Sequence, residues 1–461
     1  MKSTDKLLPL LRDGQLELHC INIKIWQEDG VELFGHGVIR INKQGMLYLE
    51  FICTGNTNIP PLRLAEMLPK DSLDKKDKLY LKCETLAGDI LTTSNFSIEL
   101  GLSDREPPNK KIIFLHNIQC EETVDEEDNF LYFDFSEYCD IPANRSNYET
   151  STLGYESHSR NETIIEMDEF KISIIDKKKY TYCRVTGLFD VERVFECLKF
   201  YIGFTCGSMV QPMFTVKRNK HHKISIISSI SNIQKRQRSS NPVPSTFGKK
   251  KVETDYHYQI FKNIYELYEV SPNIFESIYN QWSRVWYSFQ SKSSITILTL
   301  SVAIEGLLND IFIPKFKQFD VNDHLDEEIS NIKSLVSDLN ISPAKIERLK
   351  SSISYWKNIT AAKSLDYLVT LGVVSLEEKR AWSKLRNSSA HPKTKDVNTA
   401  SLEKERQDLL LCLNLFHNLV FNTLKYSGPR HYWIVNCNEP LRIIENIEIN
   451  ESSKQLLRTI T

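Results

Sequence analysis

The sequence lacks any segment that would direct it into or across a membrane. Residues 1–14, MKSTDKLLPLLRDG, contain no apolar stretch of signal-peptide length and no cleavage site. The longest apolar stretch, 295–308, is interrupted by Thr, Ser and Glu and is too short to span a bilayer. We therefore expect a soluble cytoplasmic protein.

Several motifs of well-known enzymes are also missing. The chain has ten cysteines but no C-x-x-C pair, which argues against a zinc site or a thioredoxin-like motif. Scattered cysteines of this kind are usually buried thiols in a reducing compartment. No P-loop, G-x-S-x-G or H-E-x-x-H motif occurs, and the acidic run 121–128 has no further ligands at metal-binding spacing. We expect no metal and no cofactor.

The sequence has almost no net charge, so its average composition does not indicate a nucleic-acid partner. The formal charge is −2 over 461 residues, a length that suggests two or three domains. One segment departs from this balance, because residues 217–251 contain ten Lys/Arg and no Asp or Glu. We interpret 217–251 as a basic, flexible linker between two domains.

Residues 1–216 have the pattern of an antiparallel β protein. Stretches such as LELHCINIKIW and GMLYLEFICTG alternate apolar and polar residues and are separated by turn-forming residues. This pattern predicts a β-rich domain with a sandwich-like or barrel-like arrangement. Residues 190–205 are the exception and have the character of a helix within it.

Residues 252–461 have helical periodicity instead. The stretch SSITILTLSVAIEGLLNDIF carries one polar stripe at Ser301, Glu305 and Asn309, each four residues apart. A later helix begins with a capping box formed by Ser375 and Glu378. We predict an α+β multidomain protein whose C-terminal domain is an all-α bundle.

The stretch SKLRNSSAHPKTK, residues 383–395, has the side chains needed to cut RNA without a metal. On a helix, Asn387 and His391 lie nearly on one face, and Arg386 reaches the same edge. Three lysines add positive charge around them: Lys384, Lys393 and Lys395. RNA carries its own nucleophile in the ribose 2′-hydroxyl, so a base, a charged group and correct alignment are sufficient.

This part of the chain resembles the HEPN ribonucleases, whose motif is Arg, a polar residue, and His four to six positions later. Arg386, Asn387 and His391 fill these places, and AIEGLLND resembles the family's early helix with an inward Glu, here Glu305. The segment LKYSGPRHYW resembles the Tyr-x-Gly segment of the ApeA-like branch of phage-defence HEPN proteins. The resemblance covers about 255–437; over the N-terminal half it extends to architecture only.

The resemblance implies a homodimer whose active site combines both copies of the motif. His391 would act as general base or acid, Arg386 would stabilise the phosphorane-like transition state, and Asn387 would orient His391 or bind the phosphate. Glu305 would pair with Arg386, or be a solvated residue on its stripe. The substrate would be tRNA or mRNA, the products a 2′,3′-cyclic phosphate and a 5′-hydroxyl, and a phage-derived trigger would act at the N-terminal domain.

Two other functional interpretations remain open from the residues alone. In the first, the helical domain is a non-catalytic HEPN module that binds nucleotide or RNA, or that dimerises, while the β domain recognises a partner. Alternatively, the protein is a nucleic-acid-binding regulator that works through segment 217–251, with binding that falls steeply as salt rises.

Overall fold

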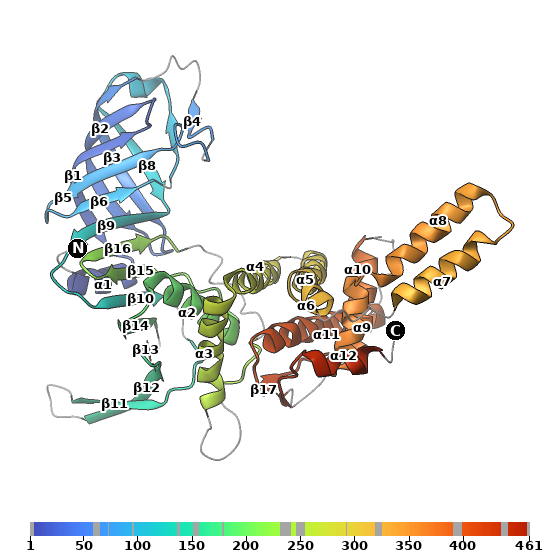
Figure 1. Ribbon diagram of the computed structural model, residues 1–461. Coiled ribbons are helices and arrows are strands. Elements are labelled where there is room, and N and C mark those ends of the chain that lie inside the picture. Colours follow the sequence, from blue (N-terminus) through green and yellow to red (C-terminus); the bar gives the residue numbers. More distant parts are fainter. Residues whose placement is uncertain are drawn as a thin grey trace. The chain divides into compact units, whose positions relative to one another are not determined.

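The computed structural model describes residues 4–58, 65–71, 73–94, 96–135, 139–150, 156–177, 179–230, 241–245, 254–291, 293–318, 325–390, 399–434 and 441–458. The chain forms two compact units (Figure 1). The β unit comprises Met1–Glu196 with Val210–Arg236, and the helical unit comprises Cys197–Met209 with Gln237–Thr461. The predicted α+β organisation, with a β-rich N-terminal part and a helical C-terminal part, is confirmed.

The β unit is built on one antiparallel sheet of fourteen strands. Their order is β11-β12-β13-β14-β10-β15-β16-β9-β6-β5-β1-β2-β3-β8. The strands are β1 (Glu17–Trp26), β2 (Glu32–Ile41), β3 (Leu47–Thr57), β5 (Tyr80–Thr85), β6 (Ile90–Thr93), β8 (Asn109–Leu115), β9 (Asn117–Thr123), β10 (Asn129–Phe135), β11 (Arg145–Thr150), β12 (Glu156–Glu166), β13 (Phe170–Asp176), β14 (Thr181–Gly187), β15 (Phe214–Asn219) and β16 (His222–Ser228). A second, two-stranded sheet joins β4 (Glu66–Leu68) to β7 (Ile98–Leu100), and a 3-10 turn, η1 (Leu102–Arg105), follows. Helix α1 (Thr4–Arg12) precedes the sheet, and α2 (Val191–Cys206) is the helix predicted within 190–205.

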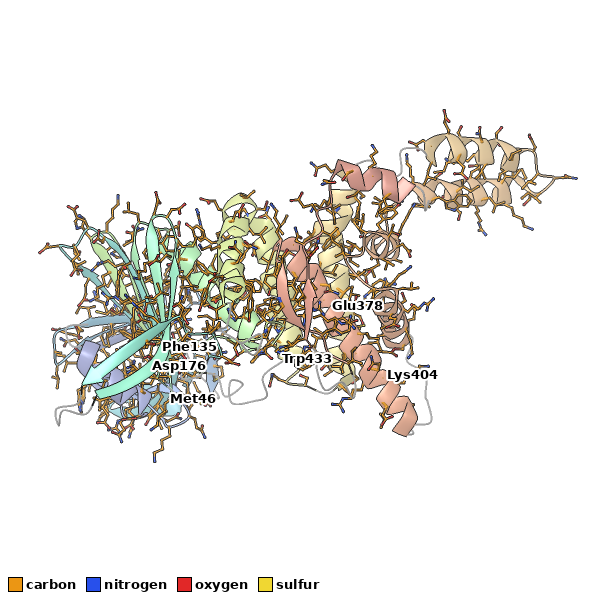
Figure 2. All side chains as sticks on the ribbon, turned by 90° about the horizontal axis from the view of Figure 1, so that it is seen from below. Met46, Phe135, Asp176, Glu378, Lys404 and Trp433 are labelled. Carbon is orange, nitrogen blue, oxygen red and sulfur yellow. The ribbon has the colours of Figure 1, made fainter. Side chains whose placement is uncertain are left out.

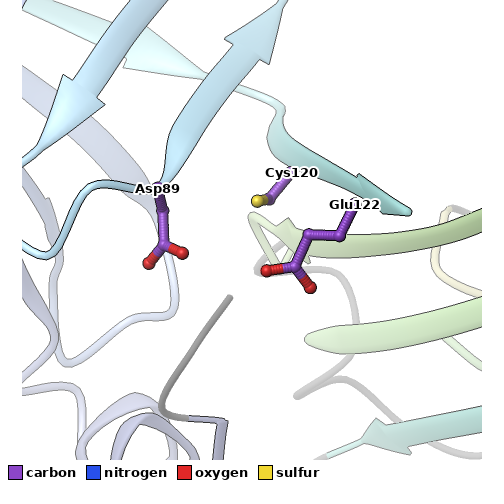
Figure 3. A group of neighbouring side chains, drawn as sticks. All are labelled: Asp89, Cys120 and Glu122. Atoms are coloured by element: carbon purple, nitrogen blue, oxygen red, sulfur yellow. The ribbon is translucent and has the colours of Figure 1, made fainter. Parts of the chain in front are cut away.

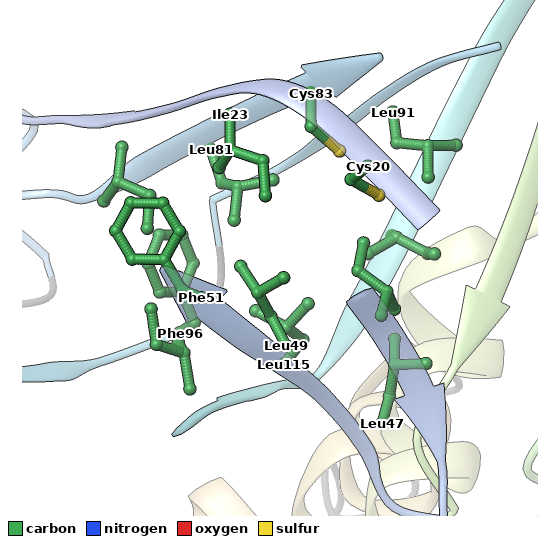
Figure 4. Close-up of a cluster of buried hydrophobic side chains, with 14 of the residues drawn as sticks. Cys20, Ile23, Leu47, Leu49, Phe51, Leu81, Cys83, Leu91, Phe96 and Leu115 are labelled. Carbon is green, nitrogen blue, oxygen red and sulfur yellow. The ribbon is translucent and has the colours of Figure 1, made fainter. Parts of the chain in front are cut away.

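The period-two pattern of the sequence gives the sheet its buried face. In β13, Phe170, Ile172 and Ile174 are buried and the intervening residues are not. Strands β1 to β9, together with β15 and β16, contribute to a single apolar cluster that includes Cys20 and Cys83 (Figure 4). Every cysteine that the structure describes is a buried free thiol, as the sequence predicts.

The linker prediction for 217–251 is wrong over its first part. Residues 217–228 form the end of β15 and all of β16, which pair with each other and with β10 and β9. Their cations face acidic partners, because Lys217 lies 2.6 Å from Glu192 and Lys223 lies 3.0 Å from Glu122. We overlooked the alternation of buried and exposed positions in this segment, where Ser225 and Ile227 are buried, because basic residues are so frequent in it. Residues 231–240 and 246–251 of the predicted linker lie outside the described residues.

The helical unit contains ten α-helices within its described residues, besides the part of α2 from Cys197 onward. They are α3 (Asp255–Val270), α4 (Pro272–Ser288), α5 (Ser293–Leu307), α6 (Ile313–Gln318), α7 (Leu325–Ser337), α8 (Pro343–Ser354), α9 (Ala361–Thr370), α10 (Leu376–Ala390), α11 (Thr399–Thr423) and α12 (Glu451–Arg458). A π-helical turn, η3 (Leu308–Phe312), joins α5 to α6, and a 3-10 turn, η4 (Tyr355–Lys357), follows α8. After α11, β17 (Gly428–His431) and β18 (Leu441–Ile444) form a small hairpin.

The run Ser293–Gln318 is the one described helix that is long and apolar enough to cross a membrane by length and composition. In this structure, 56 % of its apolar window is buried. A buried core helix meets the same criteria as a membrane span. The burial is consistent with the core helix of a soluble protein, and the cytoplasmic location stays a prediction.

An ion pair between Arg12 on α1 and the buried Asp134 connects α1 to the sheet of the β unit. Nε of Arg12 donates a hydrogen bond of 2.7 Å to Asp134 on β10, and the Asp134 side chain is fully buried. The guanidinium also stacks 3.6 Å above the ring of Tyr180. Burial raises the pKa of Asp134, so this carboxylate depends on Arg12 to remain charged.

We predict that Arg12→Ala destabilises the β unit by about 3 kcal/mol or more, because it leaves a buried carboxylate without its cation. The exposed Arg184→Ala, on β14, should cost less than about 1 kcal/mol and serves as the control. Chemical denaturation measures both. Equal, small losses would show that Asp134 does not need Arg12.

Candidate active site around Arg386

Helix α10 has both its start and its buried face encoded in its sequence. The predicted capping box is confirmed: the backbone N–H of Ser375 donates to Glu378 at 2.7 Å, and the N–H of Glu378 donates to the Ser375 hydroxyl at 3.2 Å. Ala381, Trp382 and Leu385 follow at helical spacing, and all three are buried. The helix therefore packs one face against α5 and α11 and leaves its other face in solvent.

The register between α10 and α5 is set by two adjacent contacts. Nε1 of Trp382 donates a hydrogen bond of 3.2 Å to the backbone carbonyl of Ser301. One turn further along both helices, Arg386 meets Glu305. Because both contacts advance by four residues in the same direction, α5 and α10 run parallel at this point.

Arg386 and Glu305 form a bidentate ion pair. Nε of Arg386 donates to Oε2 at 2.9 Å, and one terminal nitrogen donates to Oε1 at 2.8 Å. The carboxylate of Glu305 raises the pKa of Arg386. The Arg386 side chain is still 48 % exposed, so much of the guanidinium remains open to a ligand. Of the two alternatives for Glu305, the structure shows the pairing with Arg386.

Asn387 lies beside Arg386 on the solvent side of α10. Its side chain is exposed, and its amide makes no hydrogen bond within the part of the chain that the structure describes. An uncommitted amide next to a fixed guanidinium offers a donor and an acceptor to the same ligand. Arg386 and Asn387 are thus consecutive, solvent-exposed residues of α10.

The other predicted site residues are placed only in part. Lys384 forms an ion pair with Asp408 on α11, so a phosphate would have to compete with a carboxylate for its ammonium group. His391, Lys393 and Lys395 lie outside the described residues. Sequence reasoning missed Asp408 because its partner lies 24 residues away in the chain.

A buried polar network joins α10 to α11 and β17 (Figure 2 labels two of its residues, Glu378 and Trp433). The amide of Asn418 donates to both oxygens of Glu378, at 3.0 and 3.2 Å, and accepts from the fully buried Arg430. Arg430 also donates to the side-chain oxygen of Asn414 at 3.2 Å. The Asn414 amide in turn donates to the backbone carbonyl of Trp433 at 2.7 Å and accepts from its backbone N–H at 2.9 Å. Burial lowers the pKa of Arg430 to about 10. Asn414 and Asn418, one turn apart on an apolar helix, are the sequence signal that we overlooked.

The Tyr-Gly segment belongs to this structural layer. The hydroxyl of Tyr426 donates to the backbone carbonyl of Pro429 at 2.7 Å, and both residues are buried. Gly428 has a φ of +154°, and a Cβ there would lie 2.6 Å from the Tyr426 hydroxyl. The segment thus turns the chain tightly from α11 into β17.

One group of possible metal ligands occurs among the described residues, in the β unit. Ligand atoms of Asp89, Cys120 and Glu122 lie within 4.8 Å of one another (Figure 3). Glu122 is already paired with Lys223 at 3.0 Å. A cation bound there would have to displace an ammonium group, so we do not assign a metal to this cluster.

Comparison with known proteins does not add to this picture. No protein-family model matches the chain, and no curated protein sequence matches it. The function must therefore be argued from the geometry around Arg386.

We predict that removal of Arg430 costs much more stability than removal of Arg386. Arg430→Met should lower the free energy of unfolding by about 3 kcal/mol or more, because Glu378 would remain buried without a nearby cation. Arg386→Ala should cost at most about 1 kcal/mol, since its ion pair is largely exposed to water. Denaturation of the full chain followed by tryptophan fluorescence measures both values. A large loss for Arg386→Ala would assign that residue a structural role instead.

Proposed function

We propose that the protein is a metal-independent endoribonuclease of the HEPN type and that it acts in prokaryotic anti-phage defence by abortive infection. The observation that carries the proposal is the exposed guanidinium of Arg386, fixed by Glu305 and adjacent to the uncommitted amide of Asn387. A guanidinium fixed in this way is preorganised to receive a phosphodiester. The substrate would be tRNA or mRNA.

The proposed chemistry needs no group beyond the chain and the RNA. His391 removes the proton from the ribose 2′-hydroxyl, whose oxygen attacks the adjacent phosphorus. Arg386 stabilises the added negative charge, and Asn387 binds the phosphate or orients His391. The P–O bond to the 5′-oxygen breaks and that oxygen receives a proton, which gives a 2′,3′-cyclic phosphate and a 5′-hydroxyl. One imidazole cannot be base and acid in the same step, which favours a site completed by a second chain.

An apolar stripe on α5 supports a homodimer that would form such a site. Ile295, Leu298 and Val302 are 49 %, 49 % and 52 % exposed, and their spacing puts them on one face of the helix. The next position on that face is Glu305, the partner of Arg386. A second copy that covers the stripe would therefore bring its own Arg386 close to the first. Exposed apolar stripes of this kind mark interaction surfaces.

The β unit would sense a phage-derived trigger and restrain the nuclease. A ribonuclease that stops growth needs such control, and the chain devotes about half of its length to the β unit.

A non-catalytic binding module is the second candidate, and the same ion pair favours it. Glu305 already neutralises Arg386, as expected for an arginine that mainly holds α10 to α5. Such a module would bind RNA or nucleotide without cleaving it. The two candidates differ in whether cleaved ends appear at all.

We predict that the full chain cleaves tRNA or mRNA in the presence of EDTA and leaves 2′,3′-cyclic phosphate ends. Arg386→Ala and His391→Ala should each reduce the rate at least about a hundredfold, because each removes a group that acts in the transition state. Labelled RNA resolved on denaturing gels gives the rate, and phosphatase treatment of the ends identifies the cyclic phosphate.

Arg380→Ala is the matched control, since Arg380 is an exposed arginine on α10 that lies away from Glu305. It should retain the activity of the unmodified chain. A strict requirement for Mg²⁺, or full activity of Arg386→Ala, would refute the mechanism. RNA binding with no cleavage by any variant would favour the binding module.

We predict that Val302→Glu weakens self-association at least about tenfold, because it buries a charge in an apolar contact. Leu349→Glu, at an exposed apolar position on α8, is the control and should leave the dimer unchanged. Sedimentation equilibrium of the full chain measures both dissociation constants. A dimer unaffected by Val302→Glu would place its interface elsewhere.

A further inference from the structure

A cavity in the helical unit, whose lining does not include Arg386, has the features of a ligand site. Its volume is about 460 Å³, which is within the usual range for small-molecule pockets. The ends of α3 and α11, the start of α4, η3 and α6 line it. We call it the Lys315 pocket.

The walls of the Lys315 pocket are mainly apolar. Phe312 and Leu424 are buried, while Leu267 and Ile274 are half-buried and face the same space. Val270, also part of the lining, is 74 % exposed. An apolar cavity with an exposed apolar edge favours a ligand with an apolar or aromatic body.

Lys315 supplies the unsatisfied charge of the pocket. It is half-buried, and its ammonium group makes no ion pair or hydrogen bond with any residue that the structure describes. Burial and the nearby Lys425 lower the pKa of Lys315, and they outweigh the carboxylate of Glu448, which acts to raise it. Lys425 also lines the pocket, where its backbone φ is +52°. An acid group bound between the two lysines would relieve both the desolvation and the repulsion.

The two acidic residues of the lining do not reverse this preference. Asp310 and Glu266 are both exposed to water. The carboxylate of Asp310 already accepts a hydrogen bond of 2.7 Å from the Ser277 hydroxyl. Charges that remain hydrated need no ligand, whereas Lys315 has lost water, and Glu448 acts on it only through its electrostatic field, without a hydrogen bond.

The backbone around the pocket departs from a regular helix. Residues Leu308–Phe312 form a π-helical turn, so the run from α5 to α6 is locally widened next to the cavity. Single π-helical turns are uncommon and are frequent at functional sites. This observation is independent of the charge on Lys315.

We propose that the Lys315 pocket binds a small amphipathic anion. Its apolar or aromatic body lies against Leu267, Ile274 and Phe312, and its single carboxylate, sulfonate or phosphate pairs with Lys315. The proposal does not depend on RNA cleavage, because binding is measured without RNA.

The test compares two probes with the same rings on the full-length chain. One is 8-anilino-1-naphthalenesulfonate, an anion, and the other is N-phenyl-1-naphthylamine, its uncharged counterpart. Both are titrated by fluorescence against the unmodified chain, Lys315→Met, Ile274→Trp and Lys317→Met. Lys317→Met is the matched control, because Lys317 is an exposed lysine on α6 outside the pocket lining.

We expect Lys315→Met to weaken binding of the anion about tenfold or more, because a charged hydrogen bond is lost, and to leave the neutral probe unchanged. Ile274→Trp fills the cavity and should abolish binding of both probes, while Lys317→Met changes neither. Melting curves verify that each variant is folded, and Lys425→Met, with a smaller loss expected, replaces Lys315→Met if that variant does not fold. Unchanged affinity for the anion in Lys315→Met, equal weakening by Lys317→Met, or binding that persists in Ile274→Trp would overturn the proposal.

Discussion

The arrangement of the helical unit around Arg386 depends on the bond from the Trp382 indole to the backbone carbonyl of Ser301. The indole is buried, so α10 cannot slide along α5 without leaving a polar N–H unpaired in an apolar layer. A shift of one residue would move side chains by about 1.5 Å along the axis and by roughly 100° around it. Arg386 would then no longer face Glu305. A buried aromatic side chain thus fixes the direction of an exposed guanidinium one turn away.

The two arginines of this layer show how burial separates a structural role from a chemical one. Arg430 is completely enclosed and bonds the neutral amides of Asn414 and Asn418, and its charge is balanced through Asn418 by the carboxylate of Glu378. No ligand reaches it. Arg386 has one carboxylate partner and remains half in solvent. It has lost little hydration, so it keeps the capacity to bind a second anion. The enclosed arginine holds α10, α11 and β17 together, and the exposed one presents a binding group.

Much of the fold, and part of the site, could be predicted from local sequence patterns. The alternation of apolar and polar residues predicted the strands, and the Ser375–Glu378 capping box predicted the start of α10. The pairing of Glu305 with Arg386 was an implication of the HEPN resemblance, because the polar stripe alone fits a solvated Glu305 equally well. Residues 217–228 were misassigned because a high count of basic residues obscured the period-two pattern of β15 and β16. The pairing of Lys384 with Asp408, and the Arg430 network, depend on tertiary contacts that periodicity does not encode.

The Arg386 site and the Lys315 pocket share one helical run, which limits how they can influence each other. Glu305 lies on α5 just before η3, and Lys315 lies on α6 just after it. Trp382 fixes the register of α5 on the N-terminal side of the π-helical turn. An occupant of the pocket therefore cannot act on Arg386 by sliding α5, since that would break a buried hydrogen bond. Coupling can pass through the π-helical turn, which continues α5 into α6, or through α11, which lines the pocket and packs against α10. By either route its strength is limited to the difference in ligand affinity between the two conformations.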